Sequence, residues 1–429
     1  MEHVGLYLPF ILMFVFMAMG MPIAFAVGIS GALGIYLVSG GSALMGVLQS
    51  TPYHEVSKYL LVSLPLFVFF AEVISQTSLV NKIFDAARVW TRRIPGGMVI
   101  STVLASAGLG SITGSSTGTA AFVSKAAIPE MRRLGYDIRI SLGTVSSAGA
   151  IAILLPPSLA LIMYGIIANQ SISNLFLAAI VPAIIQVILY ISLIIWKAKK
   201  KPELFAPMEE VTKGEGWKHF INLLPILLVI TLIFTSIYTG MLTIVESAAF
   251  GAILIIAISF FNGLTIRKLG KAAIETVQIA SMLFFNLIGA IIFGYYITMT
   301  QVTQKLVNLI SSMDANRFVI LALILLVFFV LGFFMEQVII LVVAVPLVYP
   351  LIESLGFDLI WFGIVATVMA EIGMIHPPLG LNVFVATSVS GTKIEDGFAG
   401  VWGYVGACLV LIALLIIFPN IAIWLPSNL

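Results

Sequence analysis

Charged residues are scarce in this chain of 429 residues: lysine, arginine, aspartate and glutamate together make up 9% of it. A soluble domain carries about 25%, so this chain could not cover its own surface against water. Hydrophobic residues make up 61% of the chain, and apolar runs of about 20 residues recur along its whole length. The composition excludes a soluble globular protein and predicts an all-α polytopic membrane protein.

Cysteine is nearly absent, and basic residues barely outnumber acidic ones. Cys408 is the single cysteine, which excludes an internal disulfide, and with four histidines no Cys/His cluster indicates a metal centre. The formal net charge of +2 is too small to favour a nucleic-acid partner. The N-terminus lacks a basic region and a small-residue cleavage site before Pro22, so we expect the first helix to be retained.

Long polar segments are also missing, except at 197–218, which we interpret as a cytoplasmic linker between two halves. Segments 97–135 and 316–355 are about twice the length of one crossing and have polar or glycine-rich centres, so each is either two crossings or one re-entrant hairpin. The apolar segments run over 5–20, 22–39, 59–77, 97–135, 140–168, 174–196, 219–239, 242–262, 276–300, 316–355, 360–390 and 398–426.

The distribution of basic residues favours the re-entrant hairpins. With hairpins the chain has ten crossings, and placing the lysines of 197–201 in the cytoplasm puts 18 of the basic residues inside. Only Lys58, Lys305 and Arg317 then lie outside. Cytoplasmic segments of membrane proteins carry such an excess of lysine and arginine. Both termini are therefore expected on the outer, periplasmic face.

The two halves of the chain are related by an internal repeat. A shift of 221 positions aligns Pro156-Pro157 with Pro377-Pro378, and seven of the 29 positions from 129 to 157 are then identical. Each half, 1–196 and 219–429, contains an odd number of crossings, so the second half starts from the opposite face. The sequence predicts two inverted repeats, an arrangement in which transported solutes bind near the middle of the membrane.

Each repeat interrupts its helices at two places. The tip 110–118 of the first hairpin is rich in glycine, serine and threonine, and irregular backbone is tolerated in a bilayer where it is buried in protein or lines a cavity. Close helix packing by small residues is the alternative interpretation. The proline pairs lie inside the predicted broken helices 140–168 and 360–390, where proline removes a hydrogen-bond donor and unwinds the helix.

The unwound segments offer groups that can bind a cation and groups that can bind an anion. The freed carbonyl groups near Ala152, Leu155, Gly373 and His376 can bind a hard cation such as sodium. The new helix N-termini, expected at Ser158 and Leu379, can face an anion. A simple structural kink is the alternative, but two proline pairs at equivalent positions of a repeat favour a binding site.

Acidic side chains within apolar segments are candidates for function because they are costly to bury in a bilayer. Four are expected to be buried: Glu72, Glu246, Glu336 and Glu371. Glu336 lies at the second hairpin tip and is the best candidate for cation or proton coupling. His376 is interpreted as a satisfied interior histidine, a neighbour of the cation, or a pH sensor.

Several motifs together resemble the large membrane subunit of tripartite ATP-independent periplasmic (TRAP) transporters. They are Gly114, Ser115 and Ser116, followed by 128–137, 155–158, 245–248 and 376–380. The resemblance implies an elevator-type transporter of the ion-transporter superfamily. It would be a secondary active transporter that imports a small organic anion, a carboxylate or sulfonate, with sodium as the coupling ion.

The resemblance also implies partners and a location. A periplasmic substrate-binding protein would deliver the anion, and a small four-helix membrane subunit would enlarge the scaffold. Some relatives carry that subunit fused; here no N-terminal extension is present, so a separate chain is expected. The location would be the inner (cytoplasmic) membrane of a bacterial or archaeal cell, within its lipid bilayer.

The same resemblance implies site residues. The first sodium site would be formed by Gly110, Ser111, Ser115, Ala152, Leu155 and Pro157. The second would be formed by Gly332, Glu336, Gly373, His376 and Leu379. The substrate would contact Ser115, Ser116, Thr117, Gly118, Pro157, Ser158, Pro378 and Asn382. This chain departs from the family in having no acid in 117–120 and in having His376 where threonine is usual.

Two other classes of function are alternatives to a transporter. Residues 114–118 fit the pattern Gly-x-Ser-x-Gly, so Ser116 and His376 could form an intramembrane serine hydrolase. That motif needs a strand-to-helix turn, which the sequence does not predict. An ion channel is the other alternative, although re-entrant tips favour an occluded site over a continuous pore. Coupling to protons in place of sodium stays open, because carbonyl ligands cannot be read from side-chain identity.

Overall fold

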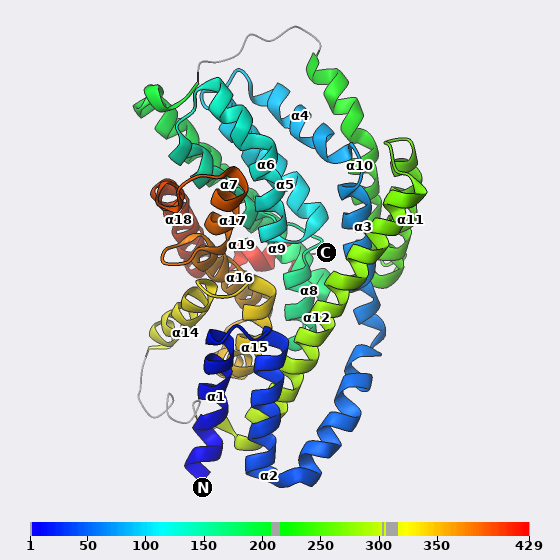
Figure 1. Cartoon of the computed structure of the whole chain (residues 1–429), viewed down its shortest axis with the longest axis vertical. Helices are drawn as coiled ribbons and strands as arrows, with labels where there is room; N and C mark the ends of the chain where they lie inside the picture. Colours follow the sequence, from blue (N-terminus) through cyan, green and yellow to red (C-terminus); the bar gives the residue numbers. More distant parts are fainter. Residues whose placement is uncertain (1, 207–214, 303, 306–315, 429) are drawn as a thin grey trace.

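The computed structural model describes residues 2–206, 215–302, 304–305 and 316–428, and the regular structure in these residues is helical (Figure 1). Part of the predicted linker, 207–214, lies outside the described residues, and so do Met1, 303, 306–315 and Leu429. The rest of the linker is partly helical, because α9 continues to Lys200.

The helices follow one another with short connections. In chain order they are α1 (Glu2–Ala18), α2 (Ile23–Val56), η1 (Tyr59–Val62), α3 (Ser63–Ser75), α4 (Leu79–Thr91), α5 (Gly97–Thr113), α6 (Ser116–Leu134), α7 (Ile138–Ile151), α8 (Leu159–Ile167), α9 (Ile172–Lys200), η2 (Pro202–Leu204), α10 (Glu215–Tyr238), α11 (Ile244–Phe260), α12 (Ile266–Thr300), α14 (Arg317–Gly332), α15 (Gln337–Ser354), α16 (Leu359–Ile375), α17 (Leu381–Ser390), α18 (Ile394–Ile417) and α19 (Asn420–Asn428).

Six helices of the described chain are long and apolar enough to cross a membrane, or up to seven if the bent pair of η1–α3 with α4 counts as one span. The predicted ten crossings are not reproduced by this count. Helices such as α11 and α16, with 17 residues each, rise about 1.5 Å per residue and fall short of a layer of about 30 Å of hydrocarbon by length alone. The chain is nevertheless a helical polytopic membrane protein with several apolar spans, as its composition predicts.

Two helices extend beyond their predicted apolar segments. Residues 41–56, which have no long apolar run, continue α2 after a kink at Gly40, where φ is +81°. The long helix α12 begins at Ile266, well before the predicted start at 276, and its first turns carry Arg267, Lys268 and Lys271. Hydropathy detects only the apolar part of such helices.

The helices of the two halves correspond. When 221, the shift that aligns the two proline pairs, is subtracted from the residue numbers of the second half, its helix bounds fall close to those of the first half. The bounds of α11 fall on 23–39, which is the part of α2 before Gly40. Those of α15 fall on 116–133, next to Ser116–Leu134 of α6. Those of α14, α16, α17 and α18 fall within a few residues of α5, α7, α8 and α9.

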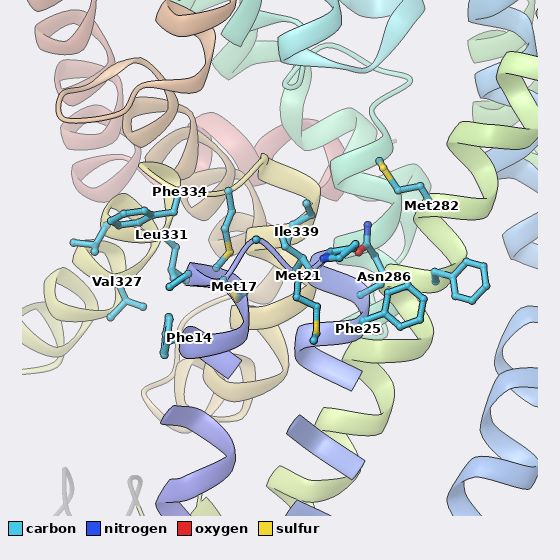
Figure 2. Close-up of a pocket in the computed structure, with 18 of the residues that line it drawn as sticks. Phe14, Met17, Met21, Phe25, Met282, Asn286, Val327, Leu331, Phe334 and Ile339 are labelled. Carbon is cyan, nitrogen blue, oxygen red and sulfur yellow. The ribbon is translucent and has the colours of Figure 1, made fainter. Parts of the chain in front are cut away.

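Small residues allow the part of α2 before Gly40 to pack closely against α12 (Figure 1). A Cβ atom on Gly31 would lie 2.6 Å from the Cα atom of Phe293, and one on Gly34 would lie 2.3 Å from the ring of Tyr296. The turn between α1 and α2 faces α12 and the tip between α14 and α15 across an apolar cavity (Figure 2). These elements therefore surround the tip of the second hairpin.

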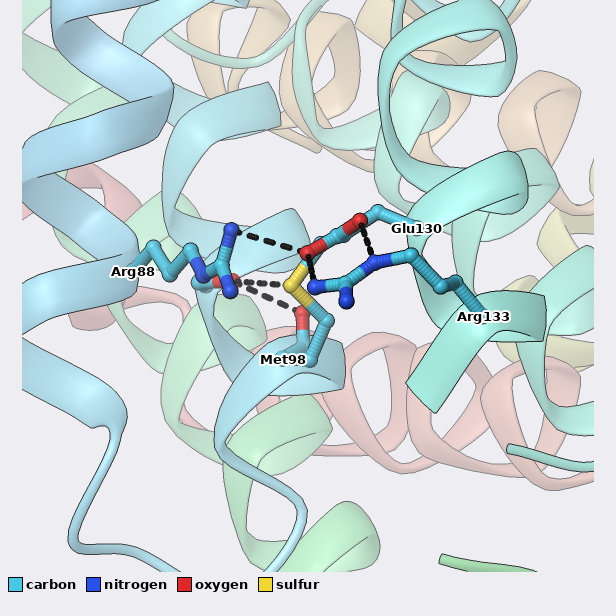
Figure 3. A network of polar contacts seen from close by, with 5 residues as sticks. Arg88, Met98, Glu130 and Arg133 are labelled. Carbon is cyan, nitrogen blue, oxygen red and sulfur yellow. Dashed lines mark hydrogen bonds and ion pairs between the residues drawn. The ribbon is translucent and has the colours of Figure 1, made fainter. Parts of the chain in front are cut away.

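A charged network joins α4 to the base of the first hairpin (Figure 3). Arg133 donates two hydrogen bonds of 2.7 Å to the carboxylate of Glu130 on the same helix, α6. Arg88 of α4 approaches the same carboxylate at 3.0 Å. The bidentate pair orients the Glu130 carboxylate within α6, and the Arg88 contact joins α4 to it.

Candidate functional site

A pocket of about 340 Å³ lies between α3, α12 and the tips of both hairpins. Most of its lining is apolar, but polar groups of both tips meet in it, and it is called the polar pocket below. Four of the predicted substrate-binding residues line it, namely Ser115, Ser116, Thr117 and Gly118, and so does Glu336. Glu72 of α3 and Gln337 at the start of α15 complete its polar lining, together with Ser75 and Thr119. The pocket therefore gathers polar groups from both halves of the chain.

The two hairpin tips touch each other through Glu336. In the first hairpin, α5 ends before Gly114, where φ is +60°. Ser115 caps α6 by accepting a 3.2 Å hydrogen bond from the amide of Gly118. Glu336 precedes the first turn of α15. Its Oε1 atom accepts hydrogen bonds from the hydroxyl groups of Thr117 at 3.0 Å and of Ser115 at 3.4 Å. One carboxylate oxygen thus joins the second tip to the N-terminus of α6.

The first hairpin also contacts the first proline-containing break. The helix α7 ends at Ile151 and α8 begins at Leu159, so Pro156 and Pro157 lie in a non-helical segment. Gly110 packs so tightly there that a Cβ atom on it would lie 2.2 Å from the Cα atom of Ala152. A Cβ atom on Gly114 would lie 3.3 Å from the carbonyl oxygen of Pro157.

The second hairpin makes a comparable contact with the last turns of α16, directly before the second break. The helix α16 ends at Ile375 and α17 begins at Leu381, with Pro377 and Pro378 between them. The proline–proline bond is cis here, as it is in the first break. A Cβ atom on Gly332 would lie 2.7 Å from the Cα atom of Gly373 and 2.7 Å from the carbonyl oxygen of Ala370. In each half, the hairpin therefore packs through a glycine against backbone that lies at the proline-containing break or just before it.

Other residues predicted for the sites lie close by but make different contacts. The hydroxyl group of Ser111 donates to the carbonyl oxygen of Gly108 at 2.8 Å. Ser158 caps α8 by accepting from the amide of Leu161 at 3.3 Å. Leu155, Pro157, Ser158, Leu379 and Pro378 belong to the two break segments and are not among the residues that line the polar pocket.

The side chain of His376 packs in an aromatic cluster. Its ring centroid lies 5.0 Å from that of Phe329 and 5.0 Å from that of Trp402. Its Nδ1 atom lies 2.5 Å from the carbonyl oxygen of Pro377. Ser116, by contrast, accepts a 2.6 Å hydrogen bond from the amide of Asn382. The described contacts therefore do not form the Ser116–His376 pair that a serine hydrolase needs.

The acidic residues divide into different environments, and one prediction is wrong. Glu246 is exposed and not buried: it caps α11, where its carboxylate accepts from the amide and the hydroxyl group of Thr243, both at 2.8 Å. Glu371 is fully buried outside the polar pocket and accepts a hydrogen bond from Gln186 of α9. Glu72 accepts a 3.1 Å hydrogen bond from Ser75 and faces the pocket.

Sequence reasoning missed two buried glutamines. Gln186 joins α9 to α16 through Glu371, and Gln337 donates a 2.8 Å hydrogen bond to the carbonyl oxygen of Thr367. Both side chains are fully buried. The signal that could have identified them is a single amide side chain inside an apolar helix, where each polar group requires a partner.

Asn382 ties α17 to the first hairpin. Its amide donates to the hydroxyl oxygen of Ser116 at 2.6 Å and to the carbonyl oxygen of Ser146 at 3.2 Å. When the proline pairs are aligned, these partners correspond to Gln337 and Thr367, which bond to each other directly in the second half. In the first half, Asn382 of α17 therefore bridges the hairpin helix α6 and α7. In the second half, Gln337 of α15 bonds directly to α16.

Replacing Asn382 with alanine should lower the stability of the protein by about 1–3 kcal/mol, because a buried polar group then loses its partner. The thermal unfolding midpoint of the detergent-solubilised protein measures this effect. Asn428→Ala is the matched control, since Asn428 is exposed at the end of α19 and bonds to the carbonyl oxygen of Trp424 within the same helix. Equal midpoints for the two variants would show that Asn382 holds no such link.

Comparisons with known proteins place the chain in a family. Residues 10–421 match the model of the family described as "Tripartite ATP-independent periplasmic transporter, DctM component". The chain is 30% identical over 408 residues to the C4-dicarboxylate TRAP transporter large permease protein DctM of Pseudomonas aeruginosa, with 94% of each chain covered. It is 26% identical to the ectoine TRAP transporter large permease protein TeaC of Halomonas elongata, with 95% of each chain covered.

Two further relatives extend the comparison. The sialic acid TRAP transporter large permease protein SiaM of Vibrio cholerae is 26% identical, again with 95% of each chain covered. Among solved structures, the YdaH transporter of Alcanivorax borkumensis shares the fold, with a TM-score of 0.62 at 13% sequence identity over 91% of this chain and 90% of that one. The match over almost the whole length shows that the chain belongs to the DctM family of TRAP transporter large permeases and is a membrane transport protein, not an enzyme.

Proposed function

We propose that this chain is the large permease subunit of a secondary active transporter that imports a small organic anion together with sodium. The observation that carries the proposal is the convergence of four irregular segments. Each hairpin packs through a glycine, Gly110 or Gly332, against backbone at a proline-containing break or just before it, and the two tips meet through Glu336. Irregular backbone at such a junction supplies the oxygen ligands and amide donors that transporters use.

The coupling ion is proposed to bind at the two junctions between hairpin and break. Sodium is a hard cation that binds oxygen, and the glycines at 110 and 332 bring the backbone of each hairpin directly against the backbone at Ala152 and at Gly373. The first site would use residues 110, 111, 115, 152, 155 and 157. The second would use 332, 336, 373, 376 and 379, with Glu336 contributing the only negative charge of either set.

The substrate is proposed to bind in the polar pocket, at the N-terminus of α6. The helix dipole favours an anion at the N-terminus of a helix. Residues 115–118 line the pocket at this place. The relatives named above are transporters of C4-dicarboxylate, ectoine and sialic acid, so a small carboxylate or sulfonate is the proposed substrate class.

Transport is proposed to follow an elevator mechanism built on two inverted repeats, 1–196 and 219–429. The correspondence of helix bounds between the halves, at the shift that aligns the proline pairs, supports the repeats. The polar pocket lies between α3 and α12 on one side and the tips on the other. In the proposed cycle the hairpins with α7, α8, α16 and α17 move as one domain against a frame that contains α2, α3 and α12.

The family implies two protein partners, a small permease subunit and a periplasmic binding protein. One relative, the isethionate TRAP transporter permease protein DctMQ of Oleidesulfovibrio alaskensis, is longer: the chain matches 60% of its length. We propose that here the small four-helix subunit is a separate chain in the inner membrane, and that both termini of the large subunit face the periplasm.

Uptake by proteoliposomes tests this function. The liposomes contain the large and small subunits and receive a binding protein loaded with radiolabelled anion. An inward sodium gradient should drive saturable accumulation that stops without the binding protein. Accumulation driven by a proton gradient in sodium-free buffer would contradict sodium coupling, and a non-saturable flux that only equilibrates the anion would contradict secondary active transport.

A further inference from the structure

A second cavity, of about 1000 Å³, borders the tip of the second hairpin (Figure 2). The tip separates it from the polar pocket: Met335 and Ile339 line the large cavity, whereas Glu336 and Val338 line the polar one. Side chains from α1, α2, α12, α14 and α15 converge on it (Figure 2). The proposed function assigns nothing to this space.

The walls of the cavity are apolar throughout. Of the 19 lining residues, Asn286 is the only one with a polar side chain. Four others are methionines, whose unbranched side chains adapt to ligands of varied shape. They are Met17, Met21, Met282 and Met335. A small organic anion would find no charged partner here, so the cavity requires a different ligand from the polar pocket.

The mouth of the cavity is continuous with apolar side chains on the outside of the chain. Phe14, Phe25, Phe285, Val327 and Phe334 belong to the lining and are each about half exposed. Phe25 and Phe285 lie on α2 and α12, which are long and apolar enough to cross a membrane, and the other three lie on α1 and on or just after α14. The medium that meets such side chains in a bilayer is hydrocarbon and not water.

We propose that this cavity binds the acyl chain of a membrane lipid. An empty space of this size would cost its lining many dispersion contacts, and water does not fill cavities without polar partners. A volume of about 1000 Å³ lies at the upper end of the range of about 300–1,000 Å³ found for ligand cavities. A hydrocarbon chain can enter sideways from the bilayer through the apolar mouth.

The position of the acyl chain has a consequence for the tip. An acyl chain in the cavity lies between α1 and α2 on one side and Leu331, Phe334 and Met335 on the other. It thereby supports the face of the tip opposite Glu336. The occupied cavity holds the α14–α15 tip at its distance from α12, where Met282 contributes to both cavities.

Photocrosslinking tests the proposal on the complete transporter. Large and small subunits are reconstituted in liposomes of phosphatidylcholine that carries a diazirine in one acyl chain, illuminated, and digested for mass spectrometry. Labelled carbon should appear on peptides from both walls, 14–25 and 326–339. Val330→Trp, which places a large ring in the cavity, should remove most of the label from Met335, which lines the cavity and is buried.

Two controls keep the outcome decisive. Leu409→Trp adds the same ring to a half-exposed position on α18, outside the cavity, and should leave the labelling unchanged. Ala18→Leu fills the cavity with a smaller change and replaces Val330→Trp if that variant fails to fold. Labelling that survives both filling substitutions, or a crosslink from these walls to a helix of the small subunit, would overturn the proposal. Sodium-driven uptake is a separate readout, so either result leaves the proposed function to its own test.

Discussion

Replacing Glu336 with glutamine should lower the initial rate of sodium-driven uptake at limiting sodium by about 100-fold. Hydrogen bonds to a charged group contribute about 1.5–3 kcal/mol, and each 1.4 kcal/mol or so corresponds to a factor of ten. Glutamine keeps the size of the side chain but removes the negative charge of the group that accepts hydrogen bonds from the hydroxyl groups of Ser115 and Thr117. It also removes the negative charge of the proposed second sodium site.

The dependence of the initial uptake rate on sodium concentration measures this effect. Glu336→Gln should raise the sodium concentration for half-maximal uptake as well as lower the rate. Glu395→Gln is the matched control, because Glu395 is an exposed carboxylate in the first turn of α18 and should behave as the parent protein. Unchanged sodium dependence in Glu336→Gln would remove this residue from the coupling site.

Replacing Gly110 with alanine should abolish transport although it adds only one methyl group. The new Cβ atom would lie 2.2 Å from the Cα atom of Ala152, so α5 and the proline-containing break must move apart. Overpacking of this kind costs about 1–3 kcal/mol, and the displacement falls on the proposed first sodium site. Uptake and thermal stability, measured on the same preparation, separate loss of the site from loss of the fold.

Gly406→Ala provides the control for this substitution. Gly406 also lies inside a helix, α18, but a Cβ atom there would meet nothing within 4 Å. Alanine at this position should leave uptake unchanged and slightly favour the helix. If Gly110→Ala transported as well as Gly406→Ala, the tight junction between hairpin and break would have no role in transport.

The parts of the fold that could be predicted are those set by residues close together in the sequence. Glycine-rich stretches and paired prolines act on their own backbone, so the ends of α5 at Thr113 and of α7 at Ile151 follow from a few neighbouring residues. The predictions of a helical membrane protein and of the TRAP family are confirmed. Both rest on apolar runs and motif spacing, which can be read directly along the sequence. The helix over 41–56 was missed because its apolar positions are too few to stand out.

The contacts of the candidate site could not be predicted in the same way. The meeting of Glu336 with Thr117 joins two hairpins from opposite halves of the chain, and nothing in either segment encodes the other. The exposed cap formed by Glu246 and the buried pair of Glu371 with Gln186 contradict a simple rule that acids in apolar segments share one environment. Burial and partners depend on how the helices pack, which the linear pattern leaves open.

The most direct test is an experimental structure of the complete transporter, determined once in sodium and once in choline. We expect an ion density beside each hairpin, near Gly110 and near Gly332, which is present in sodium and lost in choline. Hairpins that cross the bilayer completely, or proline pairs that lie in bulk water with no ion beside them, would contradict it.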